Sequence, residues 1–501
     1  MSLKANDDLA TAESAVMDNS IDAAVERRVV RKLDKHFLSL LWFLFLLAFL
    51  DRSNIGNARV AGMDKDLSLS SDQYQWLLTV FYIFYILAEP LTLMYKIVSP
   101  RTWVPLLVLG WGVAATAQAA TRSFGGMMAC RALLATFEAG YGPGTIYLLS
   151  FFYLRREIGL RIGLFFSAAP LATCFAGALA YAITSGHARL ASWRLLFLVE
   201  GIPVLVMAAV TYLVMPSSPH DAWFFTGEEK KVALARGVRQ AGQEPRVGKI
   251  SWRETFSTLL DLKAWMTAVM YFSCNVAYAS LPVFLPTILE DLGYSGLNAQ
   301  GLSAPPYFIS FLVTICSTFI ADRTQQRGLT VITLALTASA GYVMLAAARS
   351  NAARYAGVYL AALGLFPTIA NVLPWVLSNQ GSDERRGAGI VLLNLVGQCG
   401  PLLGTRLYPA SERPHYAKGH AICAAFMGFT ALLALCLRCF LVWENRKLAQ
   451  RCPPVEDADR VEGEENYGPS FRYGSMQILL ELNLVPIKSR TRQKGLQFSA
   501  T

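Results

Sequence analysis

Two charged residues, Arg131 and Glu138, lie inside one long apolar stretch of the chain. They are seven positions apart, which is about two turns of a helix, so both side chains share one face about 10 Å apart along the axis. They are too far apart to pair directly within that helix, but both can line one cavity. We expect Arg131 to attract an anionic substrate and Glu138 to take up and release a proton. The alternative is a structural ion pair with a neighbouring helix.

Three further charged residues interrupt apolar stretches. Glu89 precedes Pro90 and is a second candidate for proton coupling, with a hydrogen bond between helices as the alternative. Asp51 and Arg52 are adjacent, so their charges partly compensate each other, and a structural role and a substrate role are both open. A charge inside hydrocarbon costs about 2.5 kcal/mol or more, so each of these residues is a functional candidate.

Four uncharged amide side chains also lie in apolar surroundings and are candidates for substrate binding: Asn275, Asn371, Asn394 and Gln398. Asn394 and Gln398 are four residues apart and therefore share one helix face. Because such amides often join neighbouring helices, hydrogen bonding between helices is the alternative for each. The aromatic residues Trp42, Tyr82 and Tyr85 can stack on a planar ligand or simply pack.

A short polar turn at 322–328 contains Asp322, Arg323 and Arg327. An acid and two bases in a tight cytoplasmic turn can pair with the next helix and stabilise one conformation, so we predict that these residues have a gating role. Ordinary surface charge is the alternative. The nine cysteines show neither metal spacing nor a disulfide pattern, and the chain has no set of nucleophile and base. We therefore expect no metal, no cofactor and no enzymatic activity.

Twelve apolar segments must position these residues. Hydrophobic residues make up 54% of the 501 positions and charged residues only 16%, well below the roughly 25% of soluble domains. A helix needs about 20 residues to cross some 30 Å of hydrocarbon, and only helices satisfy every backbone polar group there. The sequence therefore predicts an all-α polytopic membrane protein. The expected spans are 37–57, 75–97, 103–121, 126–153, 160–184, 194–215, 264–288, 302–321, 329–348, 354–377, 388–408 and 420–443.

These spans fall into two six-helix halves. The predicted organisation is a cytoplasmic tail at 1–36, a bundle at 37–215, a central cytoplasmic loop at 216–262, a bundle at 263–443 and a cytoplasmic tail at 444–501. Such a plan is typical of a transporter whose halves rock around a site near the middle of the membrane. The net charge of +10 does not indicate nucleic acid, because the basic residues gather beside the spans on the side expected to face the cytoplasm.

The chain resembles the major facilitator superfamily and, within it, the fungal anion:cation symporter family that includes allantoate, nicotinate and pantothenate permeases. The matching stretches, which together cover nearly all of 37–450, are Leu50–Ala58, Arg131–Gly144, Trp193–Arg194, Glu200–Gly201, Gly381–Gly389 and Asn394–Gly404. The loop at 96–101 departs from the superfamily by lacking its usual glycine and aspartate, whereas Asp322 and Arg323 retain part of that motif in the second half.

The resemblance implies a twelve-helix fold and proton-coupled movement of a small organic anion across the plasma membrane. It also supports Arg131 and Glu138, because related vesicular anion transporters carry an arginine and a glutamate at the same spacing in the fourth helix, acting on substrate and proton. We therefore expect a monomeric, multi-pass symporter whose partners are an organic anion, protons and the lipid bilayer. Export of a secondary metabolite and nutrient sensing without transport are the alternatives.

Overall fold

In the computed structural model, residues 23–186, 189–219, 221–241, 259–379 and 383–451 are described, and their regular elements are all helices. Nine of the helices in these ranges are long and apolar enough to cross a membrane. The remaining three of the twelve expected spans correspond to α7 (Pro100–Gln118), α8 (Phe124–Phe152) and the pair α17 (Asp383–Gly397) and α18 (Gly400–Gly404). The prediction of an all-α chain is confirmed.

The first half begins with a composite span. It is formed by α2 (Ala23–Lys32), the π-helix η1 (Leu33–Leu38), α3 (Ser39–Ser53) and α4 (Ile55–Val60). After the short α5 (Met63–Asp66), the second span joins α6 (Ser71–Ala88) to the 3-10 helix η2 (Glu89–Lys96). The other spans of this half are α7, α8, α9 (Arg155–Ser185) and α10 (Ser192–Val214).

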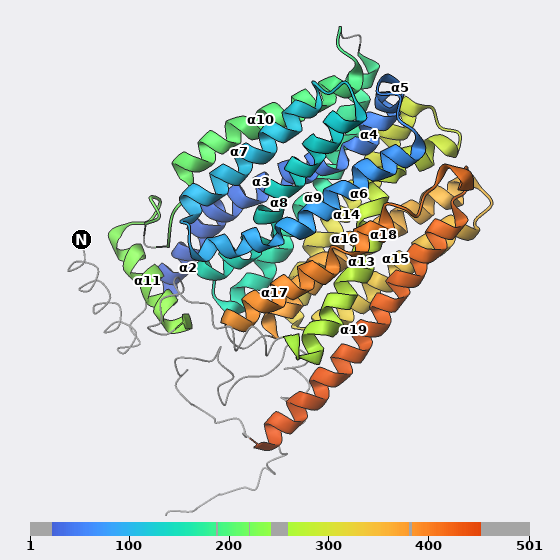
Figure 1. Cartoon of the computed structure of the whole chain (residues 1–501). Coiled ribbons are helices and arrows are strands. Elements are labelled where there is room, and N and C mark those ends of the chain that lie inside the picture. The colour runs from blue at the N-terminus through green and yellow to red at the C-terminus, as the bar shows by residue number, and fades with distance from the viewer. Residues whose placement is uncertain (1–22, 187–188, 220, 242–258, 380–382, 452–501) are drawn as a thin grey trace, which may run out of the picture.

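The second half follows the helix α11 (Gly227–Ala241) of the central stretch. Its spans are α13 (Leu262–Asp291), α14 (Gly296–Thr324), α15 (Arg327–Ala347), α16 (Asn351–Ser378), the pair α17 and α18, and α19 (Ala417–Arg451), which follows the short η3 (Ala410–Glu412). Figure 1 shows the spans running side by side, with α2 and α11 near one end of the bundle and α4 and α5 at the other.

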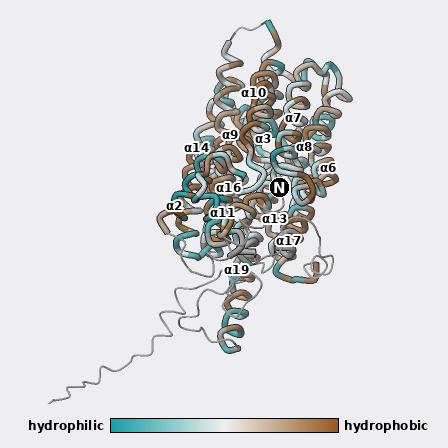
Figure 2. Tube along the Cα trace, turned by 90° about the vertical axis from the view of Figure 1, so that its left-hand side faces the viewer, coloured by the Kyte–Doolittle hydropathy of each residue, from teal (hydrophilic) through white to brown (hydrophobic). Residues whose placement is uncertain are grey.

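Several helices are longer than the sequence predicted. The first begins at Ala23, inside the predicted tail, and the last continues to Arg451. Hydropathy marks only the part of a helix that crosses hydrocarbon, so its polar extensions into water escape that signal. In Figure 2, hydrophobic residues cover much of the bundle helices, and hydrophilic residues gather around α2 and α11.

The helix α11 is fastened to the first half by ion pairs. Arg236, only 3% exposed, donates to Glu26 of α2 at 2.7 Å and to Glu157 of α9 at 2.5 Å. Lys32 and Glu229 form a further pair at 2.7 Å. The central stretch is thus partly built into the first bundle and does not serve only as a connection.

The two halves meet along several helix pairs. The helix α9 packs against α14 and α16, α4 packs against α13, α6 meets α18, and α8 meets α17. A Cβ atom at Gly56 of α4 would lie 2.3 Å from the carbonyl oxygen of Val283 in α13, so only glycine allows this close approach. Thr79 and Thr405 share a hydrogen bond of 3.2 Å between α6 and α18. These contacts enclose the space between the halves.

Candidate functional site

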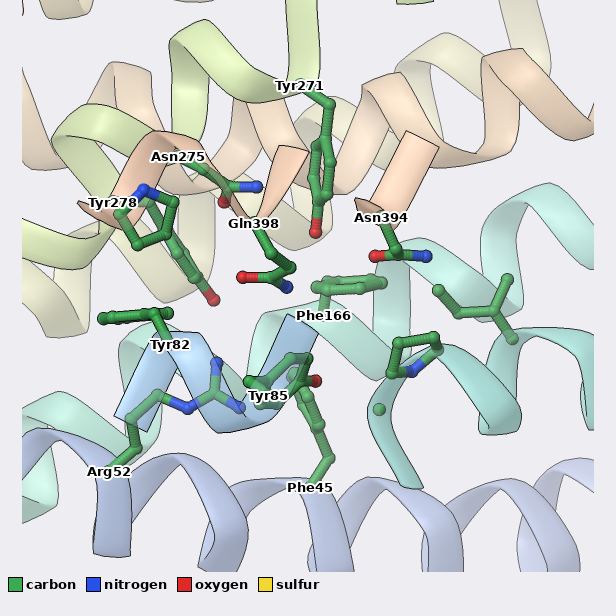
Figure 3. Close-up of a pocket in the computed structure, with 14 residues that line it drawn as sticks. Phe45, Arg52, Tyr82, Tyr85, Phe166, Tyr271, Asn275, Tyr278, Asn394 and Gln398 are labelled. Carbon is green, nitrogen blue, oxygen red and sulfur yellow. The ribbon is translucent and has the colours of Figure 1, made fainter. Parts of the chain in front are cut away.

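A narrow cavity of about 30 Å³ lies where the two halves face each other. The first half contributes one wall, which includes Phe45, Arg52, Tyr82, Tyr85 and Phe166. The second half contributes the other wall, which includes Tyr271, Asn275, Tyr278, Asn394 and Gln398. Figure 3 shows Arg52 and Tyr85 approaching this space from one side, and Tyr271, Asn275 and Gln398 from the other.

The walls differ in chemistry. The first-half wall combines aromatic rings with one guanidinium group, whereas the second-half wall combines two phenols with three amides. Aromatic rings offer flat apolar surfaces, a guanidinium binds a carboxylate through a planar fork, and amides and phenols both donate and accept hydrogen bonds. This arrangement suits a small, flat molecule with one negative charge.

Arg52 is the positive group of the cavity, and it is paired with Glu138. Its Nε and Nη2 atoms donate to the same oxygen, Oε2 of Glu138, at 3.2 and 2.8 Å. Glu138 is only 1% exposed, and its Oε1 atom has no hydrogen-bond partner. The face of α8 that carries Glu138 is held against α3 because the Tyr141 hydroxyl donates to the carbonyl oxygen of Leu41 at 2.7 Å. Glu138 therefore contacts a residue that lines the cavity, although it is not itself part of the lining.

Arg131 lies behind the cavity wall. Its side chain is 2% exposed, and its Nε and Nη1 atoms have no hydrogen-bond partner. The guanidinium groups of Arg131 and Arg52 both lie over the ring of Phe81, 4.9 and 5.0 Å from its centroid. Arg131 is thus close to the site without lining it. Neither Arg131 nor Glu138 lines the cavity as expected from the sequence, and the pair that Glu138 forms with Arg52 of α3 matches the alternative of an ion pair with a neighbouring helix.

Three of the four candidate amides line the cavity and one does not. Asn275 also donates to the carbonyl oxygen of Gly397 at 3.3 Å, and Asn394 to that of Ile390 at 2.9 Å, so each amide has a structural bond besides its place in the wall. Asn371 is fully buried elsewhere, where it donates to Ser317 at 3.3 Å and to the carbonyl oxygen of Pro367 at 2.8 Å. Its contacts fit the alternative of a hydrogen bond between helices.

Glu89 lies where α6 gives way to the 3-10 helix η2, outside the cavity lining. It is 1% exposed, and neither carboxylate oxygen has a hydrogen-bond partner. Of the three predicted aromatic candidates, Tyr82 and Tyr85 line the cavity, whereas the indole of Trp42 donates to Ser167 at 3.2 Å. Glu89 remains a candidate for a proton site close to the cavity.

The sequence prediction missed the phenols of the second-half wall. Tyr271, Asn275 and Tyr278 occupy positions i, i+4 and i+7 of α13, which places them on one helix face. That spacing was a usable signal, because it aligns two phenols with an amide already chosen as a candidate.

The described residues contain no group of three or more histidine, cysteine, aspartate or glutamate side chains that could hold a metal ion.

The predicted gating residues lie at the end of the bundle that we expect to face the cytoplasm. Arg327, only 6% exposed, pairs with Asp322 at 2.5 Å, while Arg323 is exposed. Gly159 of α9 faces this pair from the first half: a Cβ atom there would lie 2.0 Å from Nη2 of Arg327 and 3.0 Å from Oδ1 of Asp322. The ion pair therefore lies at a close contact between the halves, where any side chain at position 159 requires the guanidinium of Arg327 to shift.

Valine at Gly159 is expected to separate the halves at this end, because its side chain overlaps the Arg327–Asp322 pair. We expect slower transport, together with faster labelling of a cysteine introduced at Gln398 by an impermeant thiol reagent in inside-out vesicles, with Cys399 replaced by serine. Gly125→Val is the matched control, since no atom lies within 4 Å of its Cβ position. Equal labelling of the two variants would argue against gating at Gly159.

Comparisons with known proteins agree with this architecture. The sequence model of the Major Facilitator Superfamily matches residues 41–405. The MFS transporter prlL of Fungal sp. (strain NRRL 50135) is 32% identical, over 89% of this chain and 92% of the relative. The high-affinity nicotinic acid transporter of Saccharomyces cerevisiae is 29% identical, over 90% of this chain and 85% of the relative.

Solved structures show the same fold. The proton:xylose symporter XylE bound to 6-bromo-6-deoxy-D-glucose superposes with a TM-score of 0.63 at 15% identity, over 86% of this chain and 98% of that one. FucP in its outward conformation gives a TM-score of 0.58 at 14% identity, over 80% and 98%. The twelve-helix fold and the resemblance noted from the sequence are confirmed, as is the expectation that the protein is not an enzyme. The chain belongs to the Major Facilitator Superfamily of membrane transporters.

Proposed function

We propose that this protein is a proton-coupled symporter that takes up a small, planar organic anion across the plasma membrane and works as a monomer. The observation that carries the proposal is the ion pair between Arg52 and Glu138 at the cavity wall. One guanidinium fork can bind either the Glu138 carboxylate or the carboxylate of a substrate. The competition between them links anion binding to the state of Glu138.

The coupling follows from electrostatics. When the carboxylate of a substrate binds the guanidinium group of Arg52, Glu138 loses its positively charged partner but remains buried. An isolated carboxylate in such surroundings is strongly disfavoured as the charged form, so Glu138 binds a proton. When the anion leaves, Arg52 is again available, Glu138 ionises and its proton is released. Anion and proton therefore enter and leave the site together, which is symport.

The remaining residues have supporting roles in this proposal. Asn275, Asn394 and Gln398 hydrogen-bond the polar edge of the substrate, and Tyr82 and Tyr85 stack on its flat face. A flat ring with a carboxylate is also the form of nicotinic acid, the substrate in the name of the yeast relative. Arg131 stabilises negative charge at the site from outside the cavity lining.

The proposal also assigns roles in proton exchange and gating. Glu89 is the reserve proton site near the cavity. Asp322 and Arg327 close the cytoplasmic side through their contact with Gly159. The exposed Arg323 provides a nearby positive charge at that gate.

The direct test is uptake of a panel of labelled organic anions by cells that produce the protein, with and without a protonophore. We expect accumulation of flat monocarboxylates above the external concentration, and loss of that accumulation when the pH gradient collapses. Reconstituted vesicles then count the substrate molecules moved per protein molecule. Binding without repeated turnover for every anion would identify a sensor, and accumulation that needs an opposite pH gradient would identify an exporter.

A further inference from the structure

Glu200 is a buried carboxyl group that the proposed mechanism does not use. It lies in α10, seven residues from Trp193 at the start of that helix, and is 2% exposed. Neither of its carboxylate oxygens has a hydrogen-bond partner. Buried polar atoms are nearly always paired in folded proteins, so a carboxyl group with two unpaired oxygens requires an explanation.

Among the described residues, the charge that acts on Glu200 is that of a second acid. The electrostatic neighbour of Glu200 is Asp51 of α3, and the amide of Asn54 lies beside it. Neither the oxygen nor the nitrogen of the Asn54 amide meets the distance and angle limits for a hydrogen bond, and the same is true of Oδ2 of Asp51. These three buried polar side chains therefore lie close to one another within the first half.

The helices packed against α10 are α3, α4, α7 and α9. The charged side chains of α7 and α9 lie at the helix ends, away from the middle of the bundle. In α7 the charged residue is Arg101, at the start of the helix, and the charged residues of α9 lie at 155–161. In α4, Arg59 is 3.8 Å from Asp64 and stacks on Tyr74. Arg194 of α10 itself donates to the carbonyl oxygen of Ala119 at 2.6 Å. Among the residues that the structure describes, none of these helices brings a cation to Glu200.

The charges of the first half do not balance without bound protons. Its described spans bury the carboxyl groups of Asp51, Glu89, Glu138 and Glu200, whereas the guanidinium groups that act on these acids are those of Arg131, which is buried, and Arg52, whose side chain is 15% exposed. Arg52 pairs with Glu138, and Arg131 interacts electrostatically with Asp51. An ionised carboxylate without a cation in a medium of low polarity is strongly disfavoured. The burial of Glu200 without a paired cation therefore favours its neutral, protonated form.

The position of Glu200 lets this proton exchange during transport. Asn54 lies at the junction of α3 and α4, where the backbone stays helical: its N–H donates to the carbonyl oxygen of Leu50 at 3.0 Å, and its carbonyl oxygen accepts from Ala58 at 2.8 Å. Just beyond Asn54, α4 contacts α13 of the other half at Gly56. We expect that separation of the halves on this side removes this contact and brings water to Asp51 and Glu200.

We infer that Glu200 is a second proton-binding site, which exchanges its proton with water through Asp51 when the outer side opens, so that two protons accompany each anion. The inference rests on the proposed symport, in which Glu138 carries the first proton. Its consequence is electrical. A monoanion that moves with one proton carries no net charge, whereas a monoanion that moves with two protons carries one positive charge and responds to the membrane potential.

Vesicles reconstituted with the full chain test this inference, with labelled nicotinate as the probe. At zero potential, each coupled proton supports about a tenfold accumulation per pH unit. We expect a slope of about 100-fold for the wild type and about tenfold for Glu200→Gln, which also loses its response to an imposed potential. Glu200→Asp should retain the voltage response. Thr211→Val, at another buried position of α10, should behave as the wild type.

Infrared spectroscopy of the purified protein provides a second readout that needs no substrate. The wild type at neutral pH should show the carbonyl band of a protonated buried acid, and Glu200→Gln should lose intensity there while Thr211→Val retains it. An unchanged band in Glu200→Gln overturns the inference, as does an unchanged voltage response. If nicotinate is not accumulated by any form, the proposed substrate is wrong, and the infrared result alone decides whether Glu200 holds a proton.

Discussion

Glutamine at position 138 is expected to abolish pH-driven accumulation of the anion while exchange of internal for external anion continues. Glutamine mimics the protonated carboxyl, so Arg52 loses its internal competitor and stays available for substrate. Binding then no longer depends on a proton. Exchange, which requires only that the loaded protein reorients, should stay within a few-fold of the wild-type rate, whereas accumulation in response to an imposed pH difference should fall to the equilibrium distribution.

Side-by-side measurement of exchange and pH-driven uptake in the same vesicles checks this result. The conservative variant Glu138→Asp keeps an acid and should retain some coupling. If Glu138→Gln still concentrates the anion when a pH difference is imposed, then the first proton site lies elsewhere, and Glu89 becomes the next candidate.

Replacement of Arg52 by glutamine is expected to weaken anion binding by roughly 10- to 150-fold, which corresponds to the loss of a charged hydrogen bond of about 1.5–3 kcal/mol. It also leaves Glu138 buried without a cation, so that residue stays protonated and pH-driven uptake is lost as well. Removal of one partner of a buried ion pair can cost about 3–5 kcal/mol of stability. Thermal unfolding of the purified variant must therefore accompany the transport assay.

The two arginines can be separated by lysine substitutions. Lysine retains the charge but not the planar fork, so Arg52→Lys should weaken binding strongly because Arg52 lines the cavity. Arg131→Lys should have a smaller effect because Arg131 does not line the cavity. Arg101→Gln, at the exposed start of α7, serves as the control. A larger loss for Arg131→Lys would return direct substrate binding to Arg131, as the sequence pattern suggested.

The sequence carried most of the information on the fold. Each span is long and apolar for a simple physical reason, since hydrocarbon accepts only helices of that length. The ends were less accurate, because α2 and the last turns of α19 are polar and continue into water. The helix α11 lies in a stretch that reads as a charged loop, and its ion pairs with Glu26 and Glu157 join residues far apart in sequence.

The site was predicted in part. Burial of charge in an apolar span selected Glu138, Arg131 and Glu89, and the amide pattern selected three residues of the second-half wall. Which arginine lines the cavity and pairs with Glu138, Arg131 or Arg52, depends on how α3 is rotated about its axis relative to α8. That rotation is set by contacts between helices, such as the bond from Tyr141 to Leu41, which spacing along one helix cannot reveal. Tyr271 and Tyr278 could have been found by periodicity.

The distribution of polar groups between the two halves also has an evolutionary consequence. The carboxyl groups to which the proposed mechanism assigns protons are buried in the described spans of the first half, whereas the cavity wall of the second half presents neutral amides and phenols. Exchange of Asn394 or Gln398 for another neutral side chain leaves the ion pair of Arg52 and Glu138 intact. Relatives with this plan can therefore change their substrate through substitutions in the second half, while the first half keeps the residues proposed for proton coupling.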